Sequence, residues 1–421
     1  MLFIYNLLNI LFLPFWLLFL LYRMYKSKEQ FSRLGERFGL ASIRKTQGKK
    51  LIWLHAASVG EILSAIPLIE QLNAHLPGHQ ILITSGTITS AKITLNRLSG
   101  LAIHQFLPLD NYLCINMFLN HWQPDLALFL ESEFWPCILT QTASRCQIIS
   151  VNTRISERSF NKWQKYPNLA RSIIDSFGLF LPQSLLDQRR LQALGVTNYS
   201  YLGNLKYSTS KQIVDQAILT SLRNMLRDRV VLLAASTHPG EEEVLASIFK
   251  ILRPKIKNLL LILAPRHPVR SSEIKQLLTD TFGFNVATRS AQETLNAKTD
   301  VYLADTLGEL NYFYSIAPIS IVGGSFVPIG GHNPIEPAKC DCVIITGPNY
   351  ANFKEIYDEF FSAEAAFCAQ NEQDCATIIE RLYSNPKMQK QYTKNALELV
   401  ARKDQTLELV VDKILTYTKW K

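Results

Sequence analysis

The sequence lacks the short motifs that define several large enzyme classes. None of its 421 residues belongs to a G-x-x-x-x-G-K-[ST] phosphate loop, a G-x-S-x-G nucleophile turn or a Rossmann G-x-G-x-x-G fingerprint. These absences count against P-loop, hydrolase and dehydrogenase classes. RNP, zinc-finger and heptad patterns are missing too, so we expect no nucleic-acid partner.

Cysteine and histidine are few and scattered. The seven cysteines show no C-x-x-C spacing and stand mostly in apolar runs, which is typical of reduced core cysteine in the cytosol. The eight histidines form no H-E-x-x-H and no clustered ligand set. We therefore expect neither a metal nor another cofactor.

What the chain does have is apolar content and positive charge. Hydrophobic residues make up 48% of it, which excludes disorder, and its length predicts two domains instead of one core. The net charge of +9 favours an anionic partner, and lipid is the stronger candidate once nucleic acid is set aside.

Residues 1–22 carry no charge and consist almost wholly of Leu, Ile and aromatic side chains. A helix of that length can just cross a bilayer. Arg23 and Lys26 follow the run, so the positive-inside rule places the rest of the chain in the cytoplasm, and a signal peptide is disfavoured. Pro14 weakens the span, which leaves insertion into one leaflet open. We expect a membrane anchor over 1–24 that holds an enzyme-sized body on the cytoplasmic side of a membrane.

The segment Arg33–Gly39 (R-L-G-E-R-F-G) follows this run. One interpretation is a basic juxtamembrane segment that binds anionic headgroups. The other is a contact with a phosphorylated lipid substrate, and the sequence leaves both open.

Short apolar runs alternate with amphipathic stretches from Leu51 onward, which is the signature of parallel α/β sheets. The polar stretch Asn204–Arg229 separates two such sets. We predict two Rossmann-like, doubly wound domains, 25–208 and 209–395, facing a central cleft, with a C-terminal helix in 396–421 that packs back on the first domain. The predicted strands are Leu51–Ala56, Gln80–Thr84, Ile103–Leu107, Asp125–Leu130, Gln147–Val151, a run from Asn198 to Leu202, Val230–Ala235, Leu259–Ala264, Val301–Ala304, Pro318–Val322 and Cys342–Thr346.

Acidic residues follow two predicted strands of the first domain. In H-A-A-S-V-G-E, Glu61 falls in a first helical turn, where an acid commonly complements the helix dipole. Burial beside apolar residues would instead raise its pKa and make it a general base. In L-E-S-E-F-W-P, Glu131 and Glu133 occupy the equivalent turn. Two acids are costly to bury without purpose, although a structural pair bonded to backbone amides is the alternative.

Two cations follow strands in the same way. Lys206 in G-N-L-K either neutralises a carboxylate or leaving phosphate, or is a solvated linker lysine. Arg266 in A-P-R-H-P either forks onto a phosphate or is a surface arginine. The motif D-T-L-G-E-L offers backbone amides at a further helix start.

The stretch Val322–Ala338 (V-G-G-S-F-V-P-I-G-G-H-N-P-I-E-P-A) ends a predicted strand in one Gly pair and adds a second before a predicted helix. Glycines let backbone N–H groups approach a phosphate closely, and the carboxylate of Glu336 suits a ribose diol. A turn with a helix cap is the plainer alternative. The combination favours a nucleotide-sugar site. Further expected cleft residues are Ser58, Gly60, Glu133, Ser236, Gly324, Gly331 and His332.

Taken in order, these motifs resemble the 3-deoxy-D-manno-octulosonic acid (Kdo) transferases of Gram-negative bacteria, glycosyltransferase family 30. The resemblance runs from the N-terminal run to the C-terminal helix. It implies a GT-B fold and inverting, metal-independent transfer of Kdo from CMP-Kdo to lipid IVA, the lipid A precursor, in lipopolysaccharide synthesis. It also implies that Glu61 is the general base and that Glu131 and Lys206 stabilise the transition state. The CMP-binding residues that it implies are Pro265, Arg266, Leu307, Gly308, Glu309, Asn333, Pro334, Ile335 and Glu336.

Three alternatives remain. A membrane-bound GT-B glycosyltransferase using a UDP-sugar is disfavoured by the E-S-E and S-V-G-E motifs. A GT-B-like sugar-nucleotide epimerase needs no membrane anchor, so the uncharged N-terminal run speaks against it. A catalytically silent lipid-binding protein would tolerate the replacement of Glu61.

Overall fold

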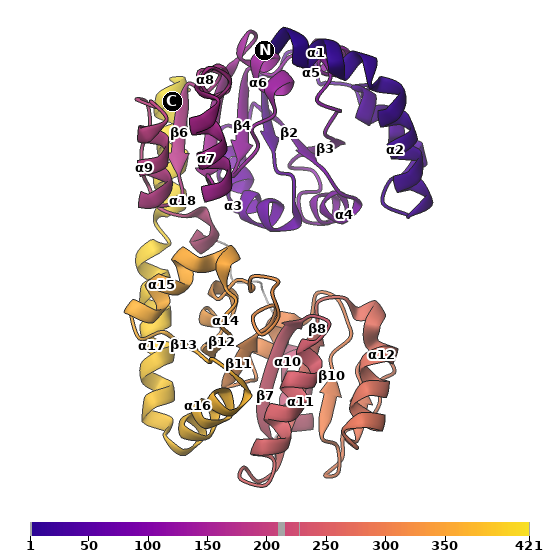
Figure 1. The fold of residues 1–421 in the computed structure, drawn as a ribbon, viewed down its shortest axis with the longest axis vertical. Helices are drawn as coiled ribbons and strands as arrows, with labels where there is room; N and C mark the ends of the chain where they lie inside the picture. The colour runs from indigo at the N-terminus through magenta and orange to yellow at the C-terminus, as the bar shows by residue number, and fades with distance from the viewer. Residues whose placement is uncertain (1, 209–214, 227, 421) are drawn as a thin grey trace. The chain divides into compact units, whose positions relative to one another are not determined.

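Two separate parallel β-sheets organise the chain (Figure 1). The structure is a computed structural model that describes residues 2–208, 215–226 and 228–420. The chain forms one compact unit from Met1–Ser210 with Lys403–Lys421 and a second from Lys211–Arg402. Each unit is a Rossmann-like α/β layer structure, as predicted.

The N-terminal apolar run forms two helices, α1 (Leu2–Leu11) and α2 (Leu13–Tyr25). Pro14 stands in the first turn of α2, where its fixed φ and missing N–H are tolerated. The expectation of one helix across 1–22 is therefore wrong. Among the described residues, no helix combines the length and apolarity needed to cross a membrane.

The sheet of the first unit has six parallel strands in the order β3-β2-β1-β4-β5-β6. Helices cover both faces, and β1 is accordingly buried along its whole length (L-I-W-L-H). The strands are β1 (Leu51–His55), β2 (Gln80–Ser85), β3 (Ile103–Phe106), β4 (Leu126–Leu130), β5 (Gln147–Thr153) and β6 (Leu179–Pro182). The helical segments are η1 (Phe31–Phe38), α3 (Val59–His75), α4 (Ile88–Arg97), α5 (Tyr112–Trp122), α6 (Pro136–Ala143), α7 (Glu157–Lys165), α8 (Pro167–Ile174), α9 (Leu185–Ala193) and η2 (Leu205–Ser208), with α18 (Thr406–Thr418) from the chain's end.

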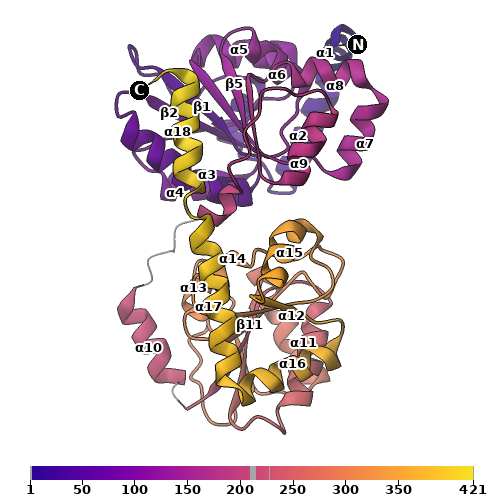
Figure 2. The same cartoon turned by 90° about the vertical axis from the view of Figure 1, so that its left-hand side faces the viewer.

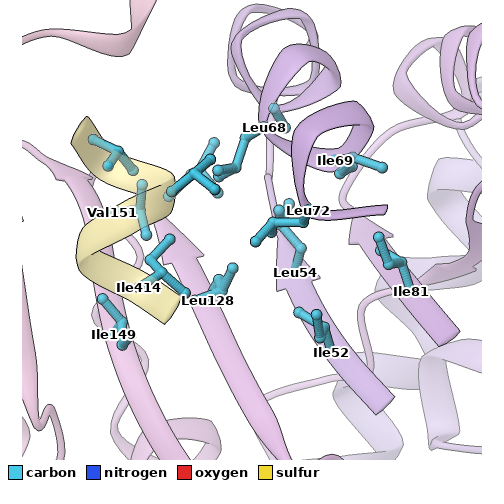
Figure 3. Close-up of a cluster of buried hydrophobic side chains, with 14 of the residues drawn as sticks. Ile52, Leu54, Leu68, Ile69, Leu72, Ile81, Leu128, Ile149, Val151 and Ile414 are labelled. Atoms are coloured by element: carbon cyan, nitrogen blue, oxygen red, sulfur yellow. The ribbon is translucent and has the colours of Figure 1, made fainter. Parts of the chain in front are cut away.

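One core cluster of this unit joins the sheet to helices from both ends of the chain. Helix α3 supplies Leu68, Ile69 and Leu72 over β1 (Figure 3). Ile414 of α18 lies over Ile149 and neighbouring residues of β4 and β5. Figure 2 shows α18, in yellow, within the first unit alongside α3, which it contacts. The last helix is thus part of the first unit's core.

The sheet of the second unit has seven parallel strands in the order β13-β12-β11-β7-β8-β10-β9. The strands are β7 (Val230–Thr237), β8 (Leu259–Pro265), β9 (Val286–Thr288), β10 (Val301–Leu303), β11 (Ile319–Val322), β12 (Val343–Thr346) and β13 (Ala366–Cys368). The helical segments are α10 (Gln216–Leu226), α11 (Glu241–Leu252), η3 (Pro268–Arg270), α12 (Ser271–Gln276), η4 (Leu277–Thr281), α13 (Leu310–Tyr314), α14 (Ile335–Ala338), η5 (Ala351–Phe353), α15 (Lys354–Ser362), α16 (Glu372–Ser384) and α17 (Pro386–Lys403).

Most predicted strands coincide with observed ones to within two residues. Three observed strands, β6, β9 and β13, were not predicted from the apolar pattern. The run from Asn198 to Leu202 forms no strand and makes only the isolated bridge between Phe180 and Tyr199. The C-terminal helix predicted in 396–421 is the end of α17 followed by α18, and part of the supposed linker is α10.

Each sheet has one topological switch point, where crossovers on either side run in opposite directions and ligands bind at the strands' carboxyl ends. In the first unit it lies between β1 and β4, and in the second between β7 and β11. These two edges are where a site is expected in each unit.

The segment Arg33–Gly39 is bonded inward, contrary to both interpretations from sequence. Arg33 binds Glu36 through two hydrogen bonds of 2.8 Å. Arg37 is buried, and it donates to the carboxylate of Glu29 and to two backbone carbonyls. These guanidinium groups fasten η1 to the sheet and are not presented to a headgroup.

Candidate functional site

Glu61 sits in the first turn of α3, just after β1. Ser58 is the N-cap, and its hydroxyl accepts from Glu61 N at 3.3 Å. The Glu61 carboxylate accepts from Ser58 Oγ and from Ala57 N, both at 2.8 Å. This reciprocal arrangement resembles a capping box, except that the carboxylate bonds to the backbone N–H before the N-cap residue, so the capping role considered from sequence is present.

The capping role does not leave Glu61 an ordinary carboxyl group. Burial raises its pKa to about 7, and the negative charges of Glu131 and Glu133 add to the effect. The hydrogen bonds from Ser58 and Ala57 oppose the rise without cancelling it. A carboxyl group with this pKa is poised to take a proton at neutral pH.

Glu131 and Lys206 form an ion pair at the end of β4, with 2.7 Å between Oε1 and Nζ. Glu131 has a φ of +54°, a left-handed conformation that is costly for a non-glycine residue and often marks functional turns. Lys206 lies on η2, which Asn152 holds through its bond from Leu205 N. Gly203, three residues before Lys206, lets the chain pass close to α18, because a Cβ there would lie 2.6 Å from Thr406 Oγ1.

Glu133 belongs to a second polar chain at the same edge. Its carboxylate accepts from Trp135 Nε1 at 2.6 Å and lies 3.1 Å from His55 Nε2. His55 Nδ1 is 2.9 Å from Thr84 Oγ1. Burial alone would raise the pKa of Glu133, but His55 and Trp135 lower it. Glu133 therefore stays anionic, and His55 is a member of this group that the sequence did not single out.

In the second unit, Arg266 follows β8 and is exposed. Among the described residues its guanidinium has no hydrogen-bond or ion-pair partner. The carboxylate of Glu336, in α14, likewise has no hydrogen-bond or ion-pair partner among the described residues. Burial raises the pKa of Glu336, and the charge of Arg266 opposes this rise. The two groups are therefore close enough to interact electrostatically and are available to a ligand.

His332 and His238 form a stacked pair beside Arg266, with 2.8 Å between their Nε2 atoms. Burial and the charge of Arg266 lower the pKa of His332 to about 4. Only one proton fits between the two nitrogens, so the pair is neutral near pH 7 and one ring donates to the other.

The first Gly pair is not free for a phosphate. The buried carboxylate of Glu241 accepts from the amides of Gly324, Ser325 and Phe326, at 2.6 to 2.9 Å. His238 N donates to the same carboxylate at 3.0 Å. This corrects the expectation that the Gly324 amide faces a ligand, because the protein's own acid occupies the anion-binding position.

The second Gly pair and the helix after it are shaped by local contacts. Gly331 has a φ of +74° and donates its N–H to Gly324 O at 2.7 Å. Asn333 Oδ1 accepts from Ile335 N at 3.0 Å, which starts α14 with Pro334 as its N-cap residue. Ile335 is fully buried as a whole residue, so neither its side chain nor its backbone is exposed to solvent. The predicted helix is a four-residue turn.

The loop after β10 presents its backbone to solvent. Leu307 is 82% exposed and Gly308 has a φ of +84°. Glu309 is committed to Arg289 through two hydrogen bonds of 2.7 and 3.0 Å. Arg289, which the sequence did not single out, thus fixes the end of this loop.

The structure therefore gathers the predicted residues into two groups. Glu61, Glu131, Glu133 and Lys206, with Ser58 and Gly60 of the α3 cap, lie at the carboxyl edge of β1 and β4. The members at the carboxyl edges of the second unit's strands are Ser236, Pro265, Arg266, Leu307, Gly308, Glu309, Gly324, Gly331, His332, Asn333, Pro334, Ile335 and Glu336.

Comparison with known proteins agrees with this architecture. The fold is similar to a glycosyltransferase from Rickettsia africae ESF-5, with a TM-score of 0.60 and 14% identity over 88% of this chain and 98% of that one. It is similar to UDP-GlcNAc 2-epimerase from Neisseria meningitidis bound to UDP-GlcNAc, with a TM-score of 0.60 and 12% identity over 87% and 100% of the chains. At such identities only the GT-B-like fold is shared.

Sequence comparison is more specific. Residues 32–209 match the family model described as 3-Deoxy-D-manno-octulosonic-acid transferase (kdotransferase). Over 409 residues the chain is 36% identical to the 3-deoxy-D-manno-octulosonic acid transferase of Rickettsia bellii (strain RML369-C), covering 96% of this chain and 97% of that protein. The fold and these matches define a glycosyltransferase of GT-B-like architecture. Within that class, the chain belongs to the 3-deoxy-D-manno-octulosonic acid transferase family.

Proposed function

We propose that this enzyme transfers Kdo from CMP-Kdo to lipid IVA, with inversion at the anomeric carbon and Glu61 as the general base. The observation that carries the proposal is the Glu61 carboxyl group, whose pKa is raised to about 7 at the β1–β4 switch point. A sugar hydroxyl is a poor nucleophile, so a carboxylate must accept its proton as the new bond forms.

The reaction is a single displacement. The acceptor oxygen attacks the anomeric carbon from the face opposite CMP, its proton passes to Glu61, and the bonding electron pair leaves with the CMP phosphate. Lys206, which is ion-paired with Glu131 at the end of β4, is the cation of the first unit's site that stabilises charge in the transition state.

The donor site is proposed at the edges of β8, β10 and β11. Arg266 meets the CMP phosphate, and the Glu336 carboxylate accepts from the ribose hydroxyls. The exposed backbone of Leu307 and Gly308 binds the nucleotide base of CMP. CMP leaves with a single phosphate, whose charge is small enough for an arginine and backbone donors to stabilise without a metal ion.

The acceptor is a lipid, and α2 is suited to meet it at the cytoplasmic face of the inner membrane. Phe15, Leu18 and Tyr22 are 58 to 64% exposed, and Lys26 and Lys28 follow. An exposed apolar helix ending in cations is typical of a segment that lies in the interface of an anionic bilayer. The proposed anchor therefore lies on the membrane surface and does not cross the bilayer.

The test is transfer to purified lipid IVA with CMP-Kdo made in situ, by wild type and Glu61→Gln, with product mass recorded with and without a chelator. We expect transfer by the wild type, little effect of the chelator, and a loss of about a hundredfold or more in the variant. Product from a UDP-sugar but not from CMP-Kdo would overturn the donor. An undiminished Glu61→Gln would move the base elsewhere, with Glu131 and Glu133 tested next.

A further inference from the structure

Helix α7 carries a hollow that is separate from the candidate site. It is open, with a volume of about 890 Å³, and its lining residues come from α7 and its two flanks. They are Ser156, Glu157, Arg158, Asn161, Lys162, Lys165 and Tyr166. Its size is within the range of ligand sites and accommodates a phosphate together with part of the headgroup that carries it.

Three cations share this hollow. Arg158, Lys162 and Lys165 are spaced four and three residues apart, so they lie on one face of the helix. Within the described parts of the chain, their charged ends make no ion pair or hydrogen bond. Glu157 is the acid among the lining residues, which leaves a net charge of +2 from three cations and one anion. Like charges three and four residues apart on a helix repel one another, and a multiply charged anion bound between them would relieve that repulsion.

The other face of α7 is fixed to the turn that carries Glu131 and Glu133. The ring of Trp163 meets Phe134 edge to face, with 4.7 Å between centroids. The chain entering α7 is bonded to the same turn, since Arg154 N donates to Glu131 O at 3.3 Å and Ser132 Oγ donates to Arg154 O at 2.8 Å. The hollow therefore lies on an element held rigidly against the proposed catalytic edge.

We propose that the α7 hollow binds a phosphate group of the lipid acceptor and thereby positions its hydroxyl toward Glu61. This rests on the proposed function, and it adds a recognition site for the acceptor headgroup. Lysine and arginine in one open hollow provide several donors to phosphate oxygens, while Ser156 and Asn161 supply neutral ones. The bilayer surface is the competing occupant of such a face, and the experiment separates the two.

The experiment compares Lys162→Gln with Lys165→Gln, singly and together, using detergent-dispersed lipid IVA and the same lipid after phosphatase treatment. The matched control is Arg44→Gln with Lys49→Gln. Both control residues are exposed and precede β1, at the opposite edge of the sheet. The readouts are KM and kcat for each acceptor, and direct binding of each acceptor to the protein without donor.

We expect the double variant to raise KM for the phosphorylated acceptor about tenfold, with kcat within threefold of the wild type. The same variant should lose little with the dephosphorylated acceptor, because the interacting group is absent. The control should change neither. Equal losses with both acceptors would indicate a structural role and overturn the proposal, as would an unchanged KM.

Two further outcomes are decisive. A variant that binds detergent-dispersed acceptor normally but sediments less with anionic vesicles would assign the hollow to the bilayer and overturn the proposal. If the wild type transfers no Kdo, the proposed function fails. Direct binding of the two acceptors still tests the α7 hollow in that case. A loss of affinity by the double variant for the phosphorylated lipid alone supports the site, and unchanged affinity for that lipid refutes it.

Discussion

Lys206 Nζ lies 2.7 Å from Glu131 Oε1, and the two side chains are only 13% and 11% exposed. This pair neutralises one of the two acids whose charge acts on Glu61. Because the partner is a lysine on a short helical turn, a single substitution alters both the proposed stabilising cation and the titration of the proposed base.

Replacing Lys206 by Met should lower kcat about a hundredfold, since the cation proposed to stabilise charge in the transition state is lost. The freed charge of Glu131 should also raise the pKa of Glu61, so the rise in rate with pH should move up by about one unit. A pH–rate profile of transfer measures both effects. Lys45→Met, which removes an exposed lysine bonded to Gln123 O, is the control. A reduced rate with an unshifted profile would contradict the coupling.

The pKa of Glu61 gives transfer a defined pH dependence. A base must be deprotonated to act, so kcat/KM should climb with pH below about 7 and level off above it. The residual rate of Glu61→Gln should not follow this titration. A wild-type profile that is flat from pH 5.5 to 8.5 would remove Glu61 as the base.

The same shift predicts a stability change of opposite sense. The pKa of Glu61 in the folded protein lies above its ordinary value of 4.5, so the folded state retains the proton longer and wild-type stability falls as pH rises from about 4.5 to 7. Glu61→Gln lacks this loss. Its stability relative to wild type should therefore increase across that window by roughly 2 kcal/mol, allowing for solvent screening, as urea titrations at each pH would show.

Glu241 is expected to be a structural acid. Glu241→Ala would leave four backbone amides without their carboxylate, at a cost of about 3 kcal/mol in unfolding free energy. Glu243→Ala, two residues on and exposed, is the control and should change stability by less than about 0.5 kcal/mol. Equal stabilities of the two variants by denaturant titration would show that these bonds contribute nothing.

Arg289 is predicted to position the loop after β10, which is proposed to bind the donor, through its contact with Glu309. Arg289→Lys would replace a two-bond contact by one, and KM for CMP-Kdo should rise about tenfold with kcat nearly unchanged. Lys275→Ala removes a half-exposed pair with Glu293 and serves as the control. A change in kcat with KM constant would place Arg289 in another role.

Two glycines with similar backbone angles should differ sharply. At Gly39, with a φ of +84°, a Cβ would lie 2.0 Å from Cys114 O, whereas at Gly48, with a φ of +78°, it would meet nothing within 4 Å. Gly48→Ala pays only backbone strain, about 1 kcal/mol, and Gly39→Ala should cost at least about 3 kcal/mol. Thermal unfolding of the two variants checks this, and similar Tm values would refute the clash.

The predictability of the fold follows from burial. Strands covered on both faces are continuous apolar runs, and β1 and β8 are therefore visible in the sequence. The missed strands β9 and β13 have three residues each, too few for any periodicity to appear. Pro14 looks from sequence like a weakness within one helix, whereas in the structure it stands at the start of a second.

The site is predictable where residues directly follow strands, as Glu61 and Glu131 do. It is not predictable where a side chain's direction depends on tertiary structure. Glu241 and Glu243 look alike in an acid-rich helix start, yet the first turns inward to bind amides of a distant loop and the second faces solvent. Arg37 likewise has the sequence context of a surface cation and is buried.

The position of α18 has a consequence for synthesis on the ribosome. Val410, Val411, Ile414 and Leu415 cover the same core as Ile52 and Leu54, yet they are translated after the whole of the second unit. Until then, the part of this apolar face over β4 and β5 lacks the cover of α18, so the first unit to begin emerging is the last to be completed. A nascent-chain binding chaperone would therefore find its target on the first unit for as long as the second is being made.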